Sequence, residues 1–157
     1  MIVVADTSPL NYLVLIDEVD LLTTLFGQVL IPTAVFEELH HSATPPKVRQ
    51  WISDPPSWLG VRSIASTSSP ALARLDLGER EAIQLALELN ASVVLMDETE
   101  GRAVAESLGL QVRGTLGVLE RGARLGKIDF RQALTKLGQT KFRISPAVRE
   151  AFLRRNS

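Results

Sequence analysis

The chain has 157 residues, of which 45% are hydrophobic, and a formal net charge of −1 at pH 7, which suits one compact domain with a full core. It contains no cysteine, and this excludes disulfides, thiolate zinc sites and cysteine nucleophiles, so carboxylates become the candidate ligands for any metal ion. The sequence has neither a basic leader-like N-terminus nor an apolar run of ~20 residues, so we expect a cytoplasmic protein without a membrane-spanning segment.

The predicted elements alternate between short buried strands and helices along the chain. Strands are expected at residues 2–5, 29–31, 58–64, 92–96 and 111–113. Helices are expected at residues 9–16, 19–27, 34–40, 46–52, 78–90 and 101–109, and from Leu116, Asp129 and Pro146 onwards, with a polar loop at 65–70. This alternation predicts the fold class α/β, a three-layer α/β/α sandwich with a central, mainly parallel sheet. We expect one domain over residues 1–157, with a basic helical C-terminal part at about 116–157.

Charge is distributed unevenly between two parts of the chain. Residues 1–100 contain 5 Lys and Arg against 14 Asp and Glu, a net charge of −9, whereas residues 101–157 contain 12 against 4, a net charge of +8. An acidic site facing a basic rim that receives a polyanion is one interpretation. Solvated helix faces are the other, and charge alone does not decide between them.

Two aspartates directly follow predicted strands. Asp6 comes after the strand at 2–5, and Asp97 comes after the strand at 92–96. Because the carboxyl ends of parallel strands meet at one edge of the sheet, where binding sites lie in such folds, we expect both carboxylates there. The simpler interpretation of Asp6 is that it, Thr7 or Ser8 caps the following helix.

The helix at 78–90 has a broad apolar face, and Glu79 falls in the middle of that face at ~100° per residue. An inward-facing glutamate needs a partner, whereas the polar residues on the opposite side are expected to face solvent. These polar residues are Arg80, Glu81, Gln84 and Glu88. Alternatively, Glu79 is a first-turn acid that the helix dipole favours, with the cap near Asp76 or Gly78.

The same projection separates two neighbouring glutamates in the helix at 34–40. Glu38 lies ~60° from Val35 and borders the buried face, whereas Glu37 lies ~160° from Val35 and faces solvent. The simpler interpretation of Glu38 is a boundary residue whose stem packs against the core.

Four carboxylates are thus predicted to face inward or toward the sheet edge. They are those of Asp6, Glu38, Glu79 and Asp97. Burying them together without compensation is costly, and a divalent cation removes that cost. Mg²⁺ or Mn²⁺ prefers oxygen ligands and retains waters, one of which can attack a phosphate. The adjacent His40 and His41 lie ~100° apart on their helix, so we expect surface residues rather than a shared metal site.

Four segments, in this order and spacing, resemble the PIN-domain nucleases, and most closely the compact group related to the VapC-type toxins of prokaryotic toxin–antitoxin pairs. They are VADTSPL (4–10), PTAVFEEL (32–39), LDLGEREAIQLALEL (75–89) and VVLMDETEGRAVA (93–105). The resemblance implies a PIN-like fold. It gives the catalytic and metal-binding positions of the family to Asp6, Glu38, Glu79 and Asp97, with Glu98 as a further metal ligand.

The resemblance also implies supporting residues and differences from the family. Thr7 or Ser8 would support the first acid or a metal-bound water. The third acid is commonly Asp but is Glu79 here, and the common second acid beside Asp97 is Glu98 here. These longer side chains alter the expected metal geometry.

The activity and partners implied by the resemblance are specific. It implies an endoribonuclease that cleaves RNA phosphodiester bonds with Mg²⁺ or Mn²⁺ and leaves 5′-phosphate and 3′-hydroxyl ends. It further implies the toxin of a toxin–antitoxin pair, a homodimer that a cognate antitoxin blocks. Basic residues after position 100 are candidates to hold RNA phosphates, namely Arg102, Arg113, Arg121 and Arg124. Thr115 is either a helix N-cap or part of a backbone site for an RNA phosphate.

Two alternatives stay open at this point. A phosphatase of the haloacid-dehalogenase type also places a nucleophilic Asp after its first strand, but it normally needs a second Asp two residues later, where this chain has Ser8. The other alternative is a catalytically inactive PIN-like module that binds RNA or protein. Metal binding separates that module from the nuclease.

Overall fold

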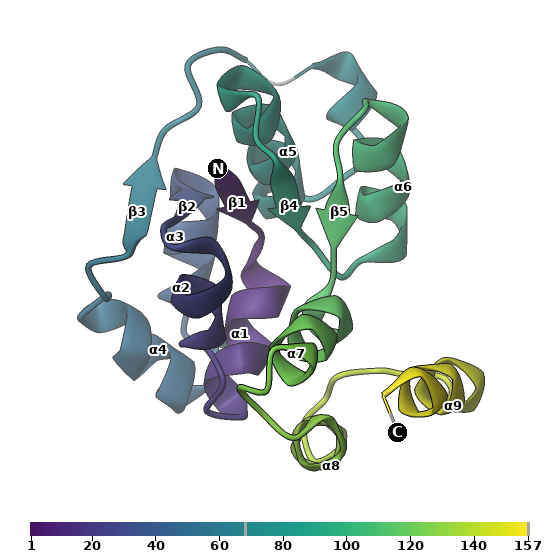
Figure 1. The fold of residues 1–157 in the computed structure, drawn as a ribbon. Helices are drawn as coiled ribbons and strands as arrows, with labels where there is room; N and C mark the ends of the chain where they lie inside the picture. Colours follow the sequence, from purple (N-terminus) through teal and green to yellow (C-terminus); the bar gives the residue numbers. More distant parts are fainter. Residues whose placement is uncertain (68, 157) are drawn as a thin grey trace.

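The chain folds around a five-stranded sheet in which every described strand pairing is parallel (Figure 1). The structure is a computed structural model that describes residues 1–67 and 69–156. The strands are β1 (Val3–Ala5), β2 (Val29–Pro32), β3 (Leu59–Arg62), β4 (Val93–Leu95) and β5 (Val112–Arg113). Their order in the sheet is β3-β2-β1-β4-β5, so β1 lies at its centre.

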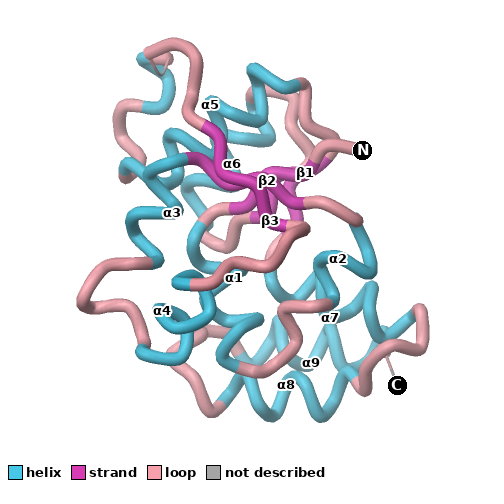
Figure 2. The backbone as a smooth tube through the Cα atoms, turned by 90° about the vertical axis from the view of Figure 1, so that its left-hand side faces the viewer, coloured by secondary structure: helices cyan, strands magenta, loops and turns pink. Residues whose placement is uncertain are grey.

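Helices cover both faces of this sheet. Those of the described residues are α1 (Thr7–Leu15), α2 (Leu21–Phe26), α3 (Thr33–Leu39), α4 (Pro46–Ser53), α5 (Leu77–Leu89), α6 (Thr99–Ser107), α7 (Thr115–Arg124), α8 (Phe130–Gly138) and α9 (Pro146–Arg155). Figure 2 shows the strands overlapping in the middle of the molecule, with α5 above them and α1, α2, α7 and α8 below, and α6 shares a buried cluster with α5. The predicted α/β fold, with three layers and a parallel central sheet, is confirmed.

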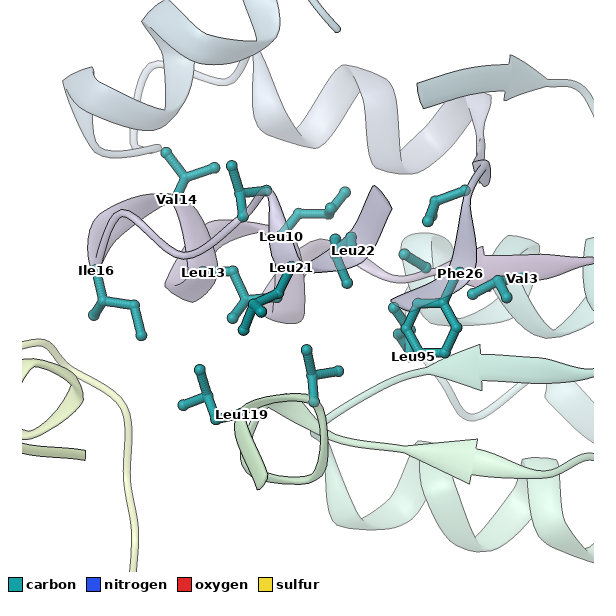
Figure 3. Packing of buried hydrophobic residues seen from close by; sticks show 14 of the residues in the cluster. Val3, Leu10, Leu13, Val14, Ile16, Leu21, Leu22, Phe26, Leu95 and Leu119 are labelled. Carbon is teal, nitrogen blue, oxygen red and sulfur yellow. The ribbon is translucent and has the colours of Figure 1, made fainter. Parts of the chain in front are cut away.

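Alternate residues of the central strand point to opposite layers of the core. Val3 and Ala5 belong to the larger buried cluster, whereas Val4 belongs to the smaller one, with Ile83 of α5 and Ala105 of α6. The larger cluster gathers side chains from α1, α2 and α7, as Figure 3 shows for Leu10, Leu13, Val14, Leu21, Leu22 and Leu119. Because β1 is packed on both faces, its carboxyl end has a fixed position in the molecule.

The strand register brings two aspartates to the same sheet edge. Ala5 at the end of β1 pairs with Leu95 at the end of β4, and the backbone N–H of Asp6 donates to the carbonyl of Leu95 at 2.9 Å. Asp97 follows β4 after one further residue, Met96. The expectation that both aspartates lie at the carboxyl edge is confirmed.

The last helix, α9, is attached to the molecule by a few defined contacts. None of its residues is fully buried, whereas α7 and α8 each bury an apolar face. Glu120 of α7 accepts hydrogen bonds from Arg155 Nε at 3.0 Å and from Asn156 Nδ2 at 2.8 Å. The ring of Phe152 stacks on that of Phe130 with centroids 6.1 Å apart. Glu120 therefore ties α9 to the body of the fold.

Some boundaries differ from the sequence-based expectation. Helix α1 begins at Thr7 rather than at residue 9, and α6 begins at Thr99 rather than at 101, because both helices start directly after one extended residue. Strand β3 is shorter than the expected 58–64, since it lies at the sheet edge and pairs with β2 alone. A 3-10 helix, η1 (Pro70–Leu72), was not expected, and Ser68 of the expected polar loop lies outside the described residues.

Among the residues that the structure describes, no helix combines the length and the apolar character needed to cross a bilayer.

Replacing Glu120 with Ala is expected to loosen α9 without unfolding the sheet. The variant loses the acceptor for Arg155 and Asn156, so amide hydrogen exchange should become several-fold faster in α9 and stay unchanged in β1 and β4. Hydrogen-exchange mass spectrometry measures this, with Glu150→Ala, an exposed glutamate of α9 itself, as the control. Unchanged exchange in α9 would show that Glu120 does not hold this helix.

Candidate active site

Asp6 is a buried carboxyl group at the carboxyl end of the central strand. Its side chain is only 6% exposed. Burial raises its pKa from 3.8 to about 8; a hydrogen bond with the Thr7 backbone opposes this shift, and the charges of Asp76, Glu79 and Glu38 add to it. Asp6 occupies the N-cap position of α1, but apart from its contact with the Thr7 backbone its side chain makes no capping hydrogen bond to that helix. The interpretation of Asp6 as a simple helix cap therefore fails.

Glu79 faces inward, as its place on the helical projection predicts, and it is also only 6% exposed. Its backbone N–H donates to Asp76 Oδ1 at 2.8 Å, and its Oε1 accepts from the Asp76 backbone N–H at 3.3 Å, which makes a reciprocal cap of α5. Burial raises the pKa of Glu79 to about 7, and the charge of Asp76 adds to this rise. Both interpretations of Glu79 are correct, because it is a first-turn acid and a buried one.

Glu38 borders the same group of acids from α3. It is half-buried while its neighbour Glu37 is exposed, so the predicted helix register is confirmed. The hydroxyl of Thr7 donates a short hydrogen bond to Glu38 Oε2. Gly78 makes room for the carboxylate, since a Cβ at that position would lie 2.5 Å from Glu38 Oε1.

Asp97 is held by hydroxyl and amide donors from two other elements. Ser8 Oγ of α1 donates to its Oδ2 at 2.8 Å, the hydroxyl of Thr115 donates to the same oxygen at 2.7 Å, and the backbone N–H of Thr115 donates to Oδ1 at 2.7 Å. The expectation that Thr115 is an N-cap is wrong, because Gly114 takes that position and Thr115 is the first residue of α7. Since Asp97 already uses the Thr115 amide, this amide is not free for a phosphate.

The structure thus brings three of the four predicted acids together and adds a fourth. The charges of Glu38, Glu79 and Asp76 each raise the pKa of Asp6, so these carboxylates lie near it. The charge of the exposed Glu98 adds to the raised pKa of Glu79. Carboxylate oxygens are the ligands that Mg²⁺ and Mn²⁺ prefer, so this donor set fits a hard divalent cation. No group of three or more His, Cys, Asp or Glu side chains among the described residues is arranged to hold a metal ion as it stands.

Two of the predicted basic residues lie beside Asp97. Arg102 and Arg113 line a cavity of about 480 Å³ that also reaches Asp97. Arg121 is not among its lining residues, and Arg124 instead pairs with Glu120 at 3.6 Å. Sequence reasoning missed Arg143, which lines this cavity and a neighbouring one of about 420 Å³ at Ser8 and Glu98.

The polar side of α5 is not solvated as expected. Glu81 Oε1 accepts from the backbone N–H of Ala34 at 3.0 Å, and Glu88 Oε1 accepts from that of Ala65 at 2.8 Å. Gln84 is buried and donates to Ser66 Oγ at 3.2 Å, while Arg80 Nε is buried without a hydrogen-bond partner in the described part of the chain. The expectation was wrong because Ala65, Ser66, Ser69 and the start of α3 cover this side of the helix. His40 and His41 are exposed, as expected.

Asp6→Asn is expected to melt at a higher temperature than the wild type in chelator near pH 8. The folded-state pKa of Asp6, about 8, exceeds its ordinary value of 3.8, so the folded state loses stability as the pH rises from about 4 through about 8. The neutral amide avoids this loss and should raise the melting temperature by at least about 5 °C. Circular dichroism melts at several pH values measure the difference, which should vanish near pH 4.

Asp20→Asn is the matched control for this comparison, because Asp20 also occupies a helix N-cap position without a capping hydrogen bond and is exposed. An Asp6→Asn variant that melts below the wild type at every pH would mean that the carboxylate stabilises the fold.

The comparisons with known proteins agree with the fold described above. A family model described as a PIN domain matches residues 2–157, while no curated protein matches the chain. The fold is similar to that of a PilT N-terminus domain protein from the hyperthermophilic archaeon Sulfolobus solfataricus, with a TM-score of 0.53 and 18% sequence identity, over 92% of this chain and 100% of that chain. Because the family match spans nearly the whole chain, the protein belongs to the PIN-domain family, whose members are generally nucleases that use divalent metal ions.

Proposed function

We propose that this protein is an endoribonuclease that uses Mg²⁺ or Mn²⁺ to hydrolyse RNA phosphodiester bonds. The observation that carries the proposal is the burial of Asp6 and Glu79 beside Glu38 and Asp76 at the carboxyl edge of a parallel sheet. Such a group of carboxylates is costly in a folded protein, and a cation among them offsets the cost. Buried acids retained at the functional edge of this fold therefore support a role in metal binding.

Asp6, Glu38 and Glu79 are the proposed ligands, with Asp97 and Glu98 at the rim. When bound, the ion supplies a nucleophilic water at neutral pH and neutralises charge on the phosphate. Because no three of these side chains are arranged as a metal cluster, at least one carboxylate would have to turn inward to hold the ion. Thr7 and Ser8 orient two of the acids, since their hydroxyls donate to Glu38 and Asp97.

Arg102 and Arg113 are proposed to hold the RNA strand. Both line the cavity that reaches Asp97, so a phosphate bound to them lies next to the acidic site. We extend the proposal to the toxin of a toxin–antitoxin pair, acting in the cytoplasm as a homodimer that a cognate antitoxin protein blocks. This extension is supported only by the resemblance of the four sequence segments to VapC-type toxins.

A second candidate is a PIN-like module that binds RNA or protein without cleaving it. It is favoured by one observation, that no three acidic side chains are arranged around a common metal position in the described residues. The phosphatase alternative receives no support, because the family match is to PIN domains and Ser8 donates to Asp97 instead of supplying an acid.

Cleavage of a labelled single-stranded RNA with and without Mn²⁺ tests the proposal. We expect cleavage only with Mn²⁺ or Mg²⁺, and Asp6→Asn, Glu38→Gln and Glu79→Gln should each reduce the rate by about 100-fold or more. Glu37→Gln is the matched control, since Glu37 is exposed on the same helix as Glu38. Cleavage that persists in chelator, or that survives Asp6→Asn, contradicts the mechanism.

Gly78→Ala tests the position of Glu38 without altering any acid. The added Cβ would lie 2.5 Å from Glu38 Oε1, so the carboxylate must move away and the cleavage rate should fall by about as much as in Glu38→Gln. Gly138→Ala, where a Cβ meets nothing within 4 Å, should retain activity. Full activity of Gly78→Ala with an unchanged melting temperature would exclude Glu38 from the site.

A further inference from the structure

The cavity of about 480 Å³ beside Asp97 lies between two distant parts of the chain. One wall comes from β5 and the start of α7, and the other comes from residues 142–155, which include α9. Its apolar lining is supplied by Val112, Leu116, Phe142, Ile144, Val148 and Phe152. A cavity of this size accommodates one small ligand unit rather than a helix or a duplex.

Four guanidinium groups line the same cavity, those of Arg102, Arg113, Arg143 and Arg155. Arg102, Arg113 and Arg143 form no ion pair with a carboxylate in the described part of the chain. By contrast, Arg155 is neutralised by Glu120 at 3.0 Å. Asp97 is the remaining carboxylate of the lining, so the three unpaired guanidinium groups leave the cavity with a net positive charge beside its apolar side chains. Such a lining suits a ligand with both an anionic and a flat apolar part.

The wall formed by α9 is held in place before any ligand arrives. Glu120 has a side chain only 14% exposed and accepts from both Arg155 and Asn156. Arg155 also lies over the Phe152 ring, with Cζ 4.4 Å from the ring centroid. These contacts reduce the ordering that binding requires.

The cavity continues toward the acidic site. It shares Asp97, Thr99, Phe142 and Arg143 with the neighbouring cavity of about 420 Å³, which Ser8, Glu98 and Lys141 also line. The ring of Phe142 is fixed by an edge-to-face contact with Tyr12, with centroids 5.0 Å apart. An extended chain that enters the acidic site therefore passes Phe142 and reaches the guanidinium groups.

We propose that this cavity is a subsite for one unstacked nucleotide of single-stranded RNA next to the phosphate that is cleaved, an inference that rests on the proposed function. Arg113 and Arg143 bind the flanking phosphates, and the base lies against the apolar side chains of the lining, with Phe142 among them. Single-stranded RNA presents a base that can be turned out of its stack onto an aromatic side chain, whereas a duplex does not. The C-terminal segment thus selects an unpaired strand.

Fluorescence anisotropy with a labelled single-stranded oligouridine in chelator tests this subsite apart from catalysis. Arg143→Ala should weaken binding about fivefold or more and reduce the salt dependence by the equivalent of about one phosphate contact. Phe142→Leu should weaken binding by a similar factor at every salt concentration. Arg149→Ala removes the same charge from an exposed position outside the cavity lining and should bind as the wild type does. Melting curves verify that each variant is folded.

Several results would overturn the subsite. These are equal affinities for Arg143→Ala and Arg149→Ala, equal affinity for duplex and single-stranded RNA, or no binding by the wild type at low salt. If an acidic peptide displaced the RNA but no mononucleotide did, the cavity would be assigned to a protein partner instead. The nuclease proposal fails separately: in that case the protein still binds RNA through Arg143 but does not cleave it with Mn²⁺.

Discussion

The carboxyl group of Asp6 is buried at the end of the central strand, among other acids, and much of the surrounding structure follows from that constraint. A buried carboxylate is costly unless it is protonated, paired or bound to a cation. No cationic side chain forms an ion pair with Asp6 in the described part of the chain. The fold supplies like charges instead, from Glu38, Asp76 and Glu79, and these raise its pKa further.

The neighbouring polar residues fix the positions of the acids that surround Asp6. Thr7 holds Glu38, and Ser8 and Thr115 hold Asp97, so two consecutive hydroxyls after Asp6 orient acids that follow other strands. Helix packing on both faces of β1 keeps this edge in register. The stability of the whole core thus offsets the unfavourable free energy of burying these carboxylates, as expected for a functional site placed on rigid elements.

Helical periodicity predicts the inward positions of Glu38 and Glu79, but it does not predict the hydrogen-bond partners of the acidic side chains. The inward positions of Glu79 and Glu38 follow from helix geometry, and the sheet edge follows from the alternation of strands and helices. The hydrogen bond from Ser8 to Asp97 joins residues 89 positions apart, and local patterns carry no information about such pairs. Glu81 was misjudged for the same reason, because its partner Ala34 is 47 positions away.

The C-terminal cavity was beyond sequence analysis for a different reason. Its guanidinium groups come from α6, β5, the segment before α9 and α9 itself, and no motif connects Arg143 with Arg113. The capping pattern of α5 is visible in the sequence, where Asp76 stands three residues before Glu79. The sequence does not show that the same Asp76 also lies near Asp6, because that contact depends on how α5 packs against β1. The uneven charge along the chain left a basic rim and solvated helix faces as alternatives, and of the four arginines named from the sequence the fold brings Arg102 and Arg113, but not Arg121 and Arg124, to the cavity beside Asp97.

The central claim is that the acids around Asp6 form a divalent-cation site. Isothermal titration calorimetry with Mn²⁺ near pH 7, in buffers of different ionisation enthalpy, measures both binding and proton release. Because the pKa of Asp6 is about 8, binding should release about one proton or more per ion, and Asp6→Asn should release fewer and bind more weakly. Absence of Mn²⁺ binding, or binding that Asp6→Asn leaves unchanged, would contradict the account.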